Sequence, residues 1–305
     1  MTSRSTRTTP DGVLADASDP SDASDPLSGV DPRFVTDWHE VDDVDDGQRF
    51  TTYWDVEPLS RGPQPPPDWL VVDRAAVDTD LGVLKTGKEA DVFLLERAVP
   101  DGPGCVLAAK RYRSSEHRTF HRSAAYTEGR TVRRSRDARA LQRGTSYGRA
   151  VAAGQWAFAE WDALVRLYEA RVPVPYPVQV DGTEILMELV TGVDGDPAPR
   201  LAPARPGPEL LAEYWHQLRD AMADLAAMGA AHGDLSPYNI LATGERLVLI
   251  DLPQLVDIVA NPAGQDFLLR DCRNVTSWFR SRGLDVDADE LFGELVTQAW
   301  GASFR

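Results

Sequence analysis

Strand-type and helix-type patterns occupy different parts of this sequence, and that order limits the fold more than any other feature. Apolar runs bounded by turn residues are predicted as strands: 81–85, 90–96, 105–112, 178–180, 185–190 and 247–251. Longer stretches with apolar residues three or four positions apart are predicted as helices: 156–170, 209–230, 264–282 and 287–300. Because most strands precede most helices, we predict an α+β protein with a strand-rich lobe, a mainly helical lobe and a cleft between them.

Composition limits the class of protein. The formal net charge of −16 excludes a nucleic-acid binder that works by overall positive charge, and a hydrophobic content of 42% is enough for a core. No apolar run reaches the ~18 residues of a membrane helix, and residues 1–10 lack the apolar stretch of a secretory signal. Cys105 and Cys272 are too few for a disulfide framework or a four-cysteine metal site. We therefore expect a soluble, cytoplasmic protein with no membrane partner.

The N-terminal part of the chain is strongly acidic. Residues 1–60 contain fourteen Asp and Glu against four Arg, and they include the low-complexity run D-A-S-D-P-S-D-A-S-D-P. Such a stretch cannot bury enough apolar surface to offset its ordering entropy. We predict a disordered acidic tail over 1–48. Residues 49–79 are expected to be a linker with a Pro-rich part and an aromatic anchor at 51–56.

A basic stretch has the opposite charge. Residues 110–150 contain twelve Lys and Arg against three Asp and Glu. We predict that 113–149 is a mobile loop that contacts RNA, the ribosome or a phosphorylated protein, since arginine suits phosphate. The acidic tail is an alternative ligand, in which case it would mask the loop. A further alternative is that part of the stretch packs as a helix and its arginines are solvated.

Three polar residues follow the helix predicted over 209–230. Asp234 and Asn239 lie in the stretch H-G-D-L-S-P-Y-N at 232–239, and Asp251 ends the next buried strand. Phosphoryl transfer needs one carboxylate to orient or deprotonate the acceptor, and oxygen ligands to hold a hard cation. We predict Asp234 for the first role and Asn239 and Asp251 as ligands of Mg²⁺.

A lysine and a glutamate complete this set. Lys110 lies at the end of the third predicted strand and can hold the phosphates from the other lobe. Glu160, on the next helix, can hold that lysine in place. Each of these residues alone would be interpreted as a solvated side chain, but their order along the chain favours a phosphotransferase.

These residues lie in motifs that resemble those of the RIO kinases, over about residues 80–290. The turn T-G-K-E-A-D-V at 86–92 resembles the family's S-T-G-K-E-[SA]-x-[VI] phosphate loop. The stretch at 232–239 matches H-x-D-L-S-x-Y-N, and I-D-L-P-Q at 250–254 resembles I-D-x-x-Q. The segment 267–279 resembles Y-L-x-R-D-x-x-N-x-x-x-F-F. The arginine-rich insertion and the lack of a preceding winged helix are in keeping with the RIO1-like branch.

The resemblance implies a bilobal protein-kinase-like fold, with residues 80–190 as an antiparallel-sheet N-lobe and 191–305 as the C-lobe. It also implies an ATP-dependent serine/threonine protein kinase. The implied ATP-binding residues are Thr86, Gly87, Lys88, Lys110, Glu160, Met187, Glu188 and Val190. Asp234 would be the catalytic-loop aspartate. Asp251 would bind Mg²⁺ and would also accept the phosphoryl group in an ATPase cycle through an aspartyl phosphate.

Two other functions fit part of the pattern. Aminoglycoside and choline phosphotransferases share H-G-D-L-x-x-x-N and a later I-D, but an aromatic residue usually follows that Asp, whereas this chain has Leu252. A nucleotide-switched module that binds RNA or the ribosome is supported only by the basic stretch. The sequence does not name a protein substrate.

Overall fold

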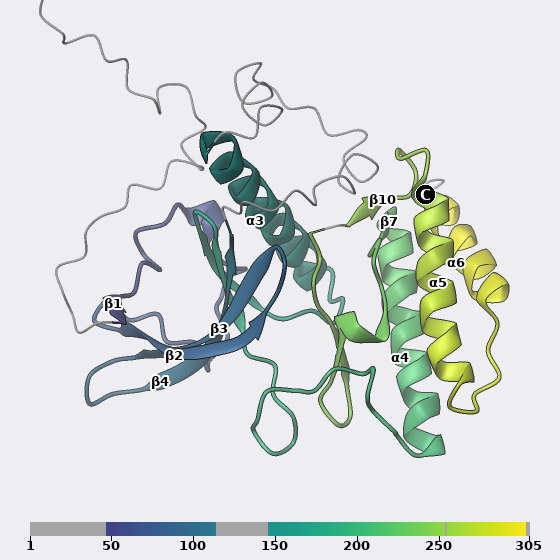
Figure 1. The fold of residues 1–305 in the computed structure, drawn as a ribbon, viewed down its shortest axis with the longest axis horizontal. Coiled ribbons are helices and arrows are strands. Elements are labelled where there is room, and N and C mark those ends of the chain that lie inside the picture. Colours follow the sequence, from purple (N-terminus) through teal and green to yellow (C-terminus); the bar gives the residue numbers. More distant parts are fainter. Residues whose placement is uncertain (1–46, 114–145, 254, 303–305) are drawn as a thin grey trace, which may run out of the picture.

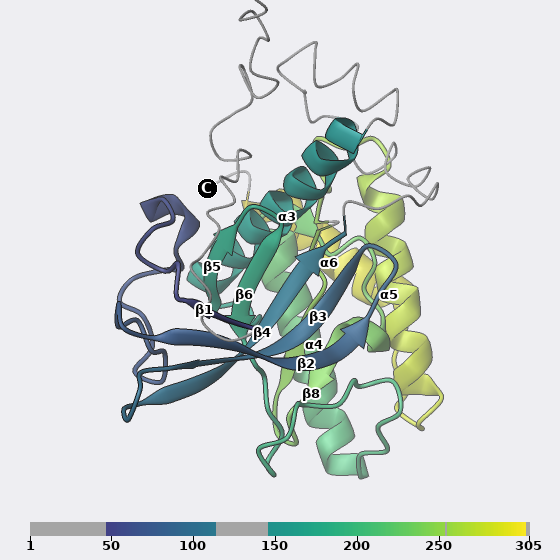
Figure 2. The same ribbon diagram turned by 60° about the vertical axis from the view of Figure 1, so that its left-hand side comes forward.

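The computed structural model describes residues 47–113, 146–253 and 255–302, and it divides them into two lobes (Figure 1). The N-terminal lobe is an antiparallel sheet with the strand order β1-β2-β3-β4-β6-β5. Its strands are β1 Gln48–Phe50, β2 Val77–Thr86, β3 Ala90–Ala98, β4 Gly104–Tyr112, β5 Pro177–Asp181 and β6 Glu184–Glu188. Helix α3, Ser146–Glu169, packs on this sheet against β4, β5 and β6 (Figure 2).

The C-terminal lobe is mainly helical. Its helices are α4 Pro208–Ala227, α5 Gly264–Arg280 and α6 Ala288–Ala302, and α6 packs on both of the others. Short strands pair beside them: β7 Ala230–Ala231 with β10 Val256–Asp257, and β8 Ile240–Ala242 with β9 Leu247–Leu249. Two 3₁₀ turns are η2 Pro58–Ser60 and η4 Pro237–Asn239. The predicted α+β fold with two lobes is therefore confirmed.

Helix α4 illustrates why the apolar spacing predicts the fold. Its residues on one face recur three or four positions apart, and the structure buries them: Leu211, Tyr214, Leu218, Met222 and Leu225. The helix begins at Pro208, whose fixed φ and missing N–H suit a first helical turn. Burial of such a stripe against α6 and the strands behind it stabilises the C-terminal lobe.

Residues 48–62, which we call the N-terminal strap, contact both edges of the sheet. At one edge β1 pairs with β2, and at the other the amide N of Gly62 donates to the carbonyl O of Val178 on β5, at 3.0 Å. Tyr53 is buried between these contacts. Edge strands offer unpaired backbone groups, and a short segment such as the strap can satisfy them.

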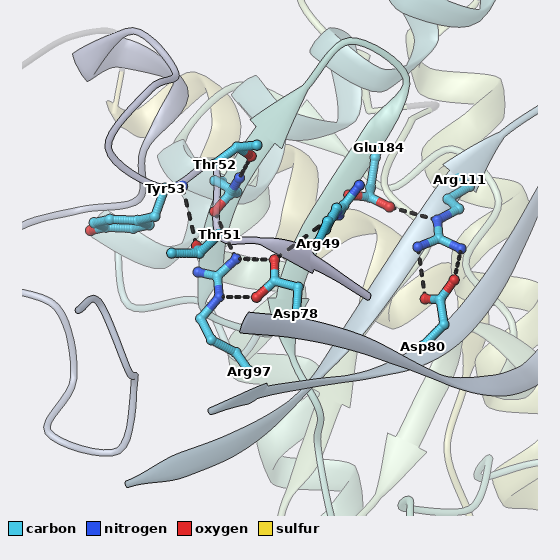
Figure 3. A network of polar contacts seen from close by, with 10 residues as sticks. Arg49, Thr51, Thr52, Tyr53, Asp78, Asp80, Arg97, Arg111 and Glu184 are labelled. Carbon is cyan, nitrogen blue, oxygen red and sulfur yellow. Dashed lines mark hydrogen bonds and ion pairs between the residues drawn. The ribbon is translucent and has the colours of Figure 1, made fainter. Parts of the chain in front are cut away.

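A buried ion pair between β2 and β3 is linked to the strap through Gln179 (Figure 3). Arg97 donates from Nε and Nη2 to the two carboxylate oxygens of Asp78, at 2.6 and 2.8 Å, and both side chains are fully buried. Arg97 Nη2 also donates to Gln179 Oε1 at 3.1 Å, and Gln179 in turn donates to Thr52 on the strap at 2.8 Å. Paired and hydrogen-bonded charges are the form in which ionised groups are tolerated inside a protein.

The acidic tail over 1–48 and the basic stretch over 113–149 lie mostly outside the described residues. The described part begins again at 146, so the last four positions of the predicted loop belong to α3. The helix therefore starts ten residues before the predicted 156. Its first residues are rich in Ala, which favours helices without forming the apolar stripe on which the prediction depended.

Candidate active site

Lys110 joins the two lobes. It lies near the end of β4, and its Nζ donates to Glu160 Oε1 on α3 at 2.7 Å and to Asp251 Oδ1 of the C-lobe at 2.9 Å. The Lys110 side chain is 12% exposed and that of Glu160 is 2% exposed. Burial disfavours the charge of Lys110, but attraction to Glu160 and Asp251 outweighs it and raises the lysine pKa. The lysine is therefore a positioned cation at neutral pH.

Glu160 has two further partners. The hydroxyl of Tyr112, on β4, donates to Oε2 of Glu160, and the backbone amide of Leu252 approaches Oε1 at 3.3 Å. Burial, together with the nearby carboxylate, raises the pKa of Tyr112, so that its hydroxyl stays a donor. Glu160 therefore connects β4, α3 and the segment around Asp251. Tyr112 has a positioning role that the sequence analysis did not assign.

Asp251 follows β9 in a left-handed backbone conformation, with φ of 69°. Asp is one of the few non-Gly residues that tolerates this region, which is costly and often occurs at functional sites. Attraction to Lys110 lowers the Asp251 pKa against the effect of burial, and the side chain is still 46% exposed. The residue is thus an ionised carboxylate with room for a ligand.

Asp234 and Asn239 lie on the loop between β7 and β8. The side-chain Nδ2 of Asn239 donates to the backbone O of Asp234 at 2.9 Å, so its Oδ1 is the atom left for a cation. The carboxylate of Asp234 is 57% exposed, and Arg270 Nη2 lies 3.9 Å from it. The backbone amide of Ile250 donates to the Asn239 carbonyl at 3.0 Å, which places Asn239 next to Asp251 in the fold.

Helix α5 fixes the backbone of the loop that carries Asp234. Asp271 accepts hydrogen bonds from the backbone amides on both sides of Asp234, those of Gly233 at 2.8 Å and Leu235 at 2.9 Å. Asn274 Nδ2 donates to the Leu235 carbonyl at 3.0 Å. Burial raises the pKa of Asp271 to about 7, although its two backbone partners favour the ionised form. The segment 267–279 was recognised as a motif, but the sequence analysis gave these two residues no role.

His232 is a buried neutral residue of the same loop. Burial lowers its pKa, and its Nε2 lies 3.0 Å from the carbonyl O of Ile250. The amide of Asp234 approaches Nδ1 at 3.4 Å. A hydrogen on Nε2 satisfies both contacts, so His232 connects the loop to the strand end before Asp251.

The predicted phosphate loop is a tight turn between β2 and β3. The Gly87 amide donates to Asp91 Oδ1 at 3.2 Å, and a Cβ on Gly87 would lie 2.6 Å from the carbonyl O of Ala90. Only glycine therefore fits there. Among the described residues, no hydrogen bond or ion pair links Thr86, Gly87 or Lys88 to the Lys110 group.

The Val190 amide of the predicted adenine hinge is an unused backbone donor among the described residues. Met187 and Glu188 end β6, and the Glu188 amide donates to the Tyr176 carbonyl at 2.9 Å. The Val190 carbonyl accepts from the Ala198 amide at 2.9 Å, but within the described ranges the Val190 amide has no partner. Val190 is 7% exposed, and a buried N–H without a partner is uncommon unless a ligand supplies one.

The oxygen atoms of this site fit a hard cation. Asp251 and Asn239 offer a carboxylate and an amide oxygen, and Mg²⁺ is usually held by one or two such ligands together with water and phosphate oxygens. In the part of the chain that the structure describes, no group of three His, Cys, Asp or Glu side chains is placed to hold a metal.

In the same part, no helix has the length and apolar character needed to cross a membrane.

Comparisons with known proteins identify relatives of this chain. A family model described as "RIO domain" matches residues 102–291, which include Lys110, Asp234 and Asp251 but not the turn at 86–88. The RIO-type serine/threonine-protein kinase Rio1 of Haloferax volcanii is 38% identical over 230 residues, which cover 75% of this chain and 72% of the relative. Serine/threonine-protein kinase RIO3 of mouse is 28% identical over 234 residues, 73% of this chain and 43% of the relative. The crystal structure of the Rio2 kinase from Chaetomium thermophilum has a TM-score of 0.50 at 21% identity, covering 74% of this chain and 69% of that one.

Proposed function

The chain belongs to the RIO family of serine/threonine-protein kinases, and we propose that it transfers the γ-phosphoryl group of ATP with Lys110, Asp234, Asn239 and Asp251. The observation that carries this proposal is the contact of one lysine with carboxylates from two elements, Glu160 on α3 and Asp251 in the C-lobe. Lys110 retains Glu160 as its partner when it turns toward the α- and β-phosphates. The comparisons do not favour a small-molecule phosphotransferase.

Asp251 and Asn239 would hold Mg²⁺, which neutralises the charge that develops on the phosphate oxygens. Asn239 suits this role because its amide nitrogen is already bonded to the Asp234 carbonyl, which fixes the orientation of its oxygen. Asp251 suits it because its pKa is lowered, so the carboxylate needs no deprotonation at neutral pH. The adenine would accept a hydrogen bond from the unpaired Val190 amide.

Asp234 would orient the hydroxyl of a Ser or Thr acceptor and take its proton. Its carboxylate is exposed, whereas its backbone is fixed because the amides on either side of it donate hydrogen bonds to Asp271. This combination of a rigid backbone and an accessible side chain is what positioning of a bulky protein acceptor requires.

Asp251 is also a candidate acceptor of the γ-phosphoryl group itself, which would lead to hydrolysis of ATP. One of its oxygens would attack the γ-phosphorus while the bond to the leaving ADP oxygen breaks, and water would then hydrolyse the aspartyl phosphate. The 46% exposure of the Asp251 side chain supports this outcome. The chain would then act as an ATPase.

The experiment is ATP turnover with Mg²⁺ by the wild type and by Asp234→Asn, Asp251→Asn and, as a matched control, Asp285→Asn. Asp285 is an exposed carboxylate in the C-lobe, remote in the sequence from the site. We expect both site variants to lose ~10²–10³-fold in turnover, which is typical for loss of one preorganised polar group, and the control to keep it. Labelled protein that hydroxylamine releases indicates an aspartyl phosphate, and resistant label indicates phosphoserine or phosphothreonine. Wild-type turnover in Asp234→Asn and Asp251→Asn would contradict the proposal.

A further inference from the structure

Two cations near the candidate site have no partner in the part of the chain that the structure describes. Lys85 lies near the end of β2, and Arg200 lies on the segment that connects β6 to α4. Within residues 47–113, 146–253 and 255–302, neither side chain forms a hydrogen bond or an ion pair. Lys110, by contrast, contacts two carboxylates. Among the described residues, Lys85 and Arg200 are therefore two cations of this region that remain available to an anion.

The sheet register places Lys85 on the same face as Lys110. Val92 on β3 is opposite Lys85 on one side and opposite Lys110 on the other. Residues opposite each other in antiparallel strands point to the same face, and two strand spacings separate the two lysines by about 10 Å. The Lys110 side chain points toward the C-lobe, where it meets Asp251. Lys85 therefore extends from the N-lobe toward the same region.

Arg200 reaches that region from the C-lobe. It forms an isolated bridge with Leu241 on β8, and the next residue, Leu201, donates its amide to the Ile240 carbonyl at 2.8 Å. The backbone of Arg200 is thus fixed beside the strand that follows the predicted metal ligand Asn239. The residue is half-buried.

The electrostatics agree with this placement. Burial lowers the pKa of Lys85, and repulsion by Arg200 and Lys110 lowers it further, while Asp251 opposes the change. Burial also lowers the pKa of Arg200, again against the attraction of Asp251. The two cations therefore lie close enough to affect each other and Asp251, with no carboxylate in direct contact to offset their charge.

We propose that Lys85 and Arg200 bind the phosphate chain of ATP from opposite lobes, in addition to Lys110. The proposal rests on the proposed function. An arginine and a lysine on two sides of one phosphate group would draw the lobes together around the nucleotide. Both charges interact with Asp251, the residue proposed to hold Mg²⁺ against the phosphates. Because the cations lie near the proposed metal ligand, we assign them to the phosphates of the nucleotide and not to an acidic group of the acceptor protein. Lys85 stands where the RIO pattern S-T-G-K-E has its serine, so this contact is a property of this chain.

The experiment is a calorimetric titration of Lys85→Ser, Arg200→Gln and the double variant with ATP, ADP and adenosine. Each single variant is expected to bind ATP about tenfold more weakly, as for loss of one charge-assisted hydrogen bond, and to bind adenosine as the wild type does. Lys85→Arg and Arg200→Lys keep the charge, and both side chains bind phosphate, so these variants are expected to stay within about threefold of the wild type. Arg205→Gln is the matched control, since Arg205 lies on the same segment and contacts only nearby carbonyls.

The outcomes separate this proposal from the proposed function. Wild-type ATP affinity in Lys85→Ser and Arg200→Gln would overturn it, and so would an equal loss of affinity for adenosine, which would indicate a structural role. Unchanged ATP affinity with a raised KM for a protein acceptor would assign the pair to the acceptor and also overturn it. A wild-type protein that binds no ATP would refute the proposed function itself.

Discussion

The substitution Glu160→Gln tests the centre of the candidate site. It keeps the shape of the side chain and removes its charge. The Glu160 side chain is 2% exposed, and it is contacted by Lys110 Nζ at 2.7 Å, by the Tyr112 hydroxyl and by the Leu252 amide. The glutamine can still accept one of these hydrogen bonds, but it leaves the lysine charge without its buried counter-ion.

The expected loss of stability follows from these contacts. Breaking a buried ion pair by removing one partner typically costs about 3–5 kcal/mol. Lys110 keeps a second carboxylate, Asp251 at 2.9 Å, but that side chain is 46% exposed and its attraction is screened. We therefore expect a loss of about 2–3 kcal/mol, below the usual range. For a protein of this size the loss corresponds to a fall in Tm of about 4–12 °C.

The pH dependence has a definite sign. The folded-state pKa of Lys110 is raised, so its contribution to stability is fully present below the unfolded value of about 10.4 and is lost only as the pH rises through the folded value. The pKa of Asp251 is lowered, so its contribution is present above about 3.9 and is lost as the pH falls through the folded value. The difference in Tm between the wild type and Glu160→Gln should therefore be constant from about pH 6 to pH 9.

The assay is thermal unfolding by circular dichroism over this pH range, together with kcat and KM for ATP. Glu169→Gln, an exposed residue of the same helix, is the control. We expect a lower Tm and a lower kcat in Glu160→Gln alone, because Lys110 is then held only by Asp251. Equal Tm values for the two variants, or a difference that changes strongly between pH 6 and pH 9, would refute this account of the ion pair.

Three further substitutions test the supports of the site. Asp271→Asn should lower the free energy of unfolding by about 2–3 kcal/mol and also lower kcat. The reason is that an amide side chain offers one oxygen acceptor, whereas the backbone amides of Gly233 and Leu235 are two donors. Urea unfolding and ATP turnover would measure the two effects. Trp161→Phe removes the indole N–H that donates to the Leu59 carbonyl at 3.2 Å, and we expect kcat to fall more than ATP affinity if the strap positions α3. Asp78→Asn leaves Arg97 buried without its counter-ion and should destabilise the protein by about 3–5 kcal/mol; unchanged urea unfolding would contradict this estimate.

The sequence predicts the elements of this fold well where an element has its own periodic pattern. Helix α4 was predicted because its apolar stripe spans the whole helix, and the stripe is buried as expected. The first ten residues of α3 were missed because they lack such a stripe. Strand β1 has only three residues, which is too short for an alternating pattern to appear in the sequence. Its strand partner on β2 lies about thirty positions away, so no local pattern predicts the pairing either.

In the candidate site, too, the residues with a recognisable sequence pattern were predictable and the others were not. The order of Lys110 and Glu160 along the chain predicts that they pair, and the structure places them in contact. Asp271 was missed because it acts through backbone amides 36 and 38 positions away, and a hydrogen bond between a side chain and a remote backbone leaves no sequence period. Lys85 carries no pattern of its own in the sequence, and only the strand register places it on the face of Lys110.

The N-terminal strap contacts both the sheet and the helix that carry the lysine–glutamate pair of the site. The strap pairs with one edge of the sheet through β1 and with the other through Gly62, so it limits how far the two edges can move apart. It also meets α3 where the Leu59 carbonyl accepts from Trp161, the residue next to Glu160. β4 and α3 carry the two members of the lysine–glutamate pair, and the strap is in contact with the sheet and the helix at once. The strap therefore links the sheet and the helix that hold the pair at 2.7 Å, and it does so with residues that precede the part of the chain matched by the family model.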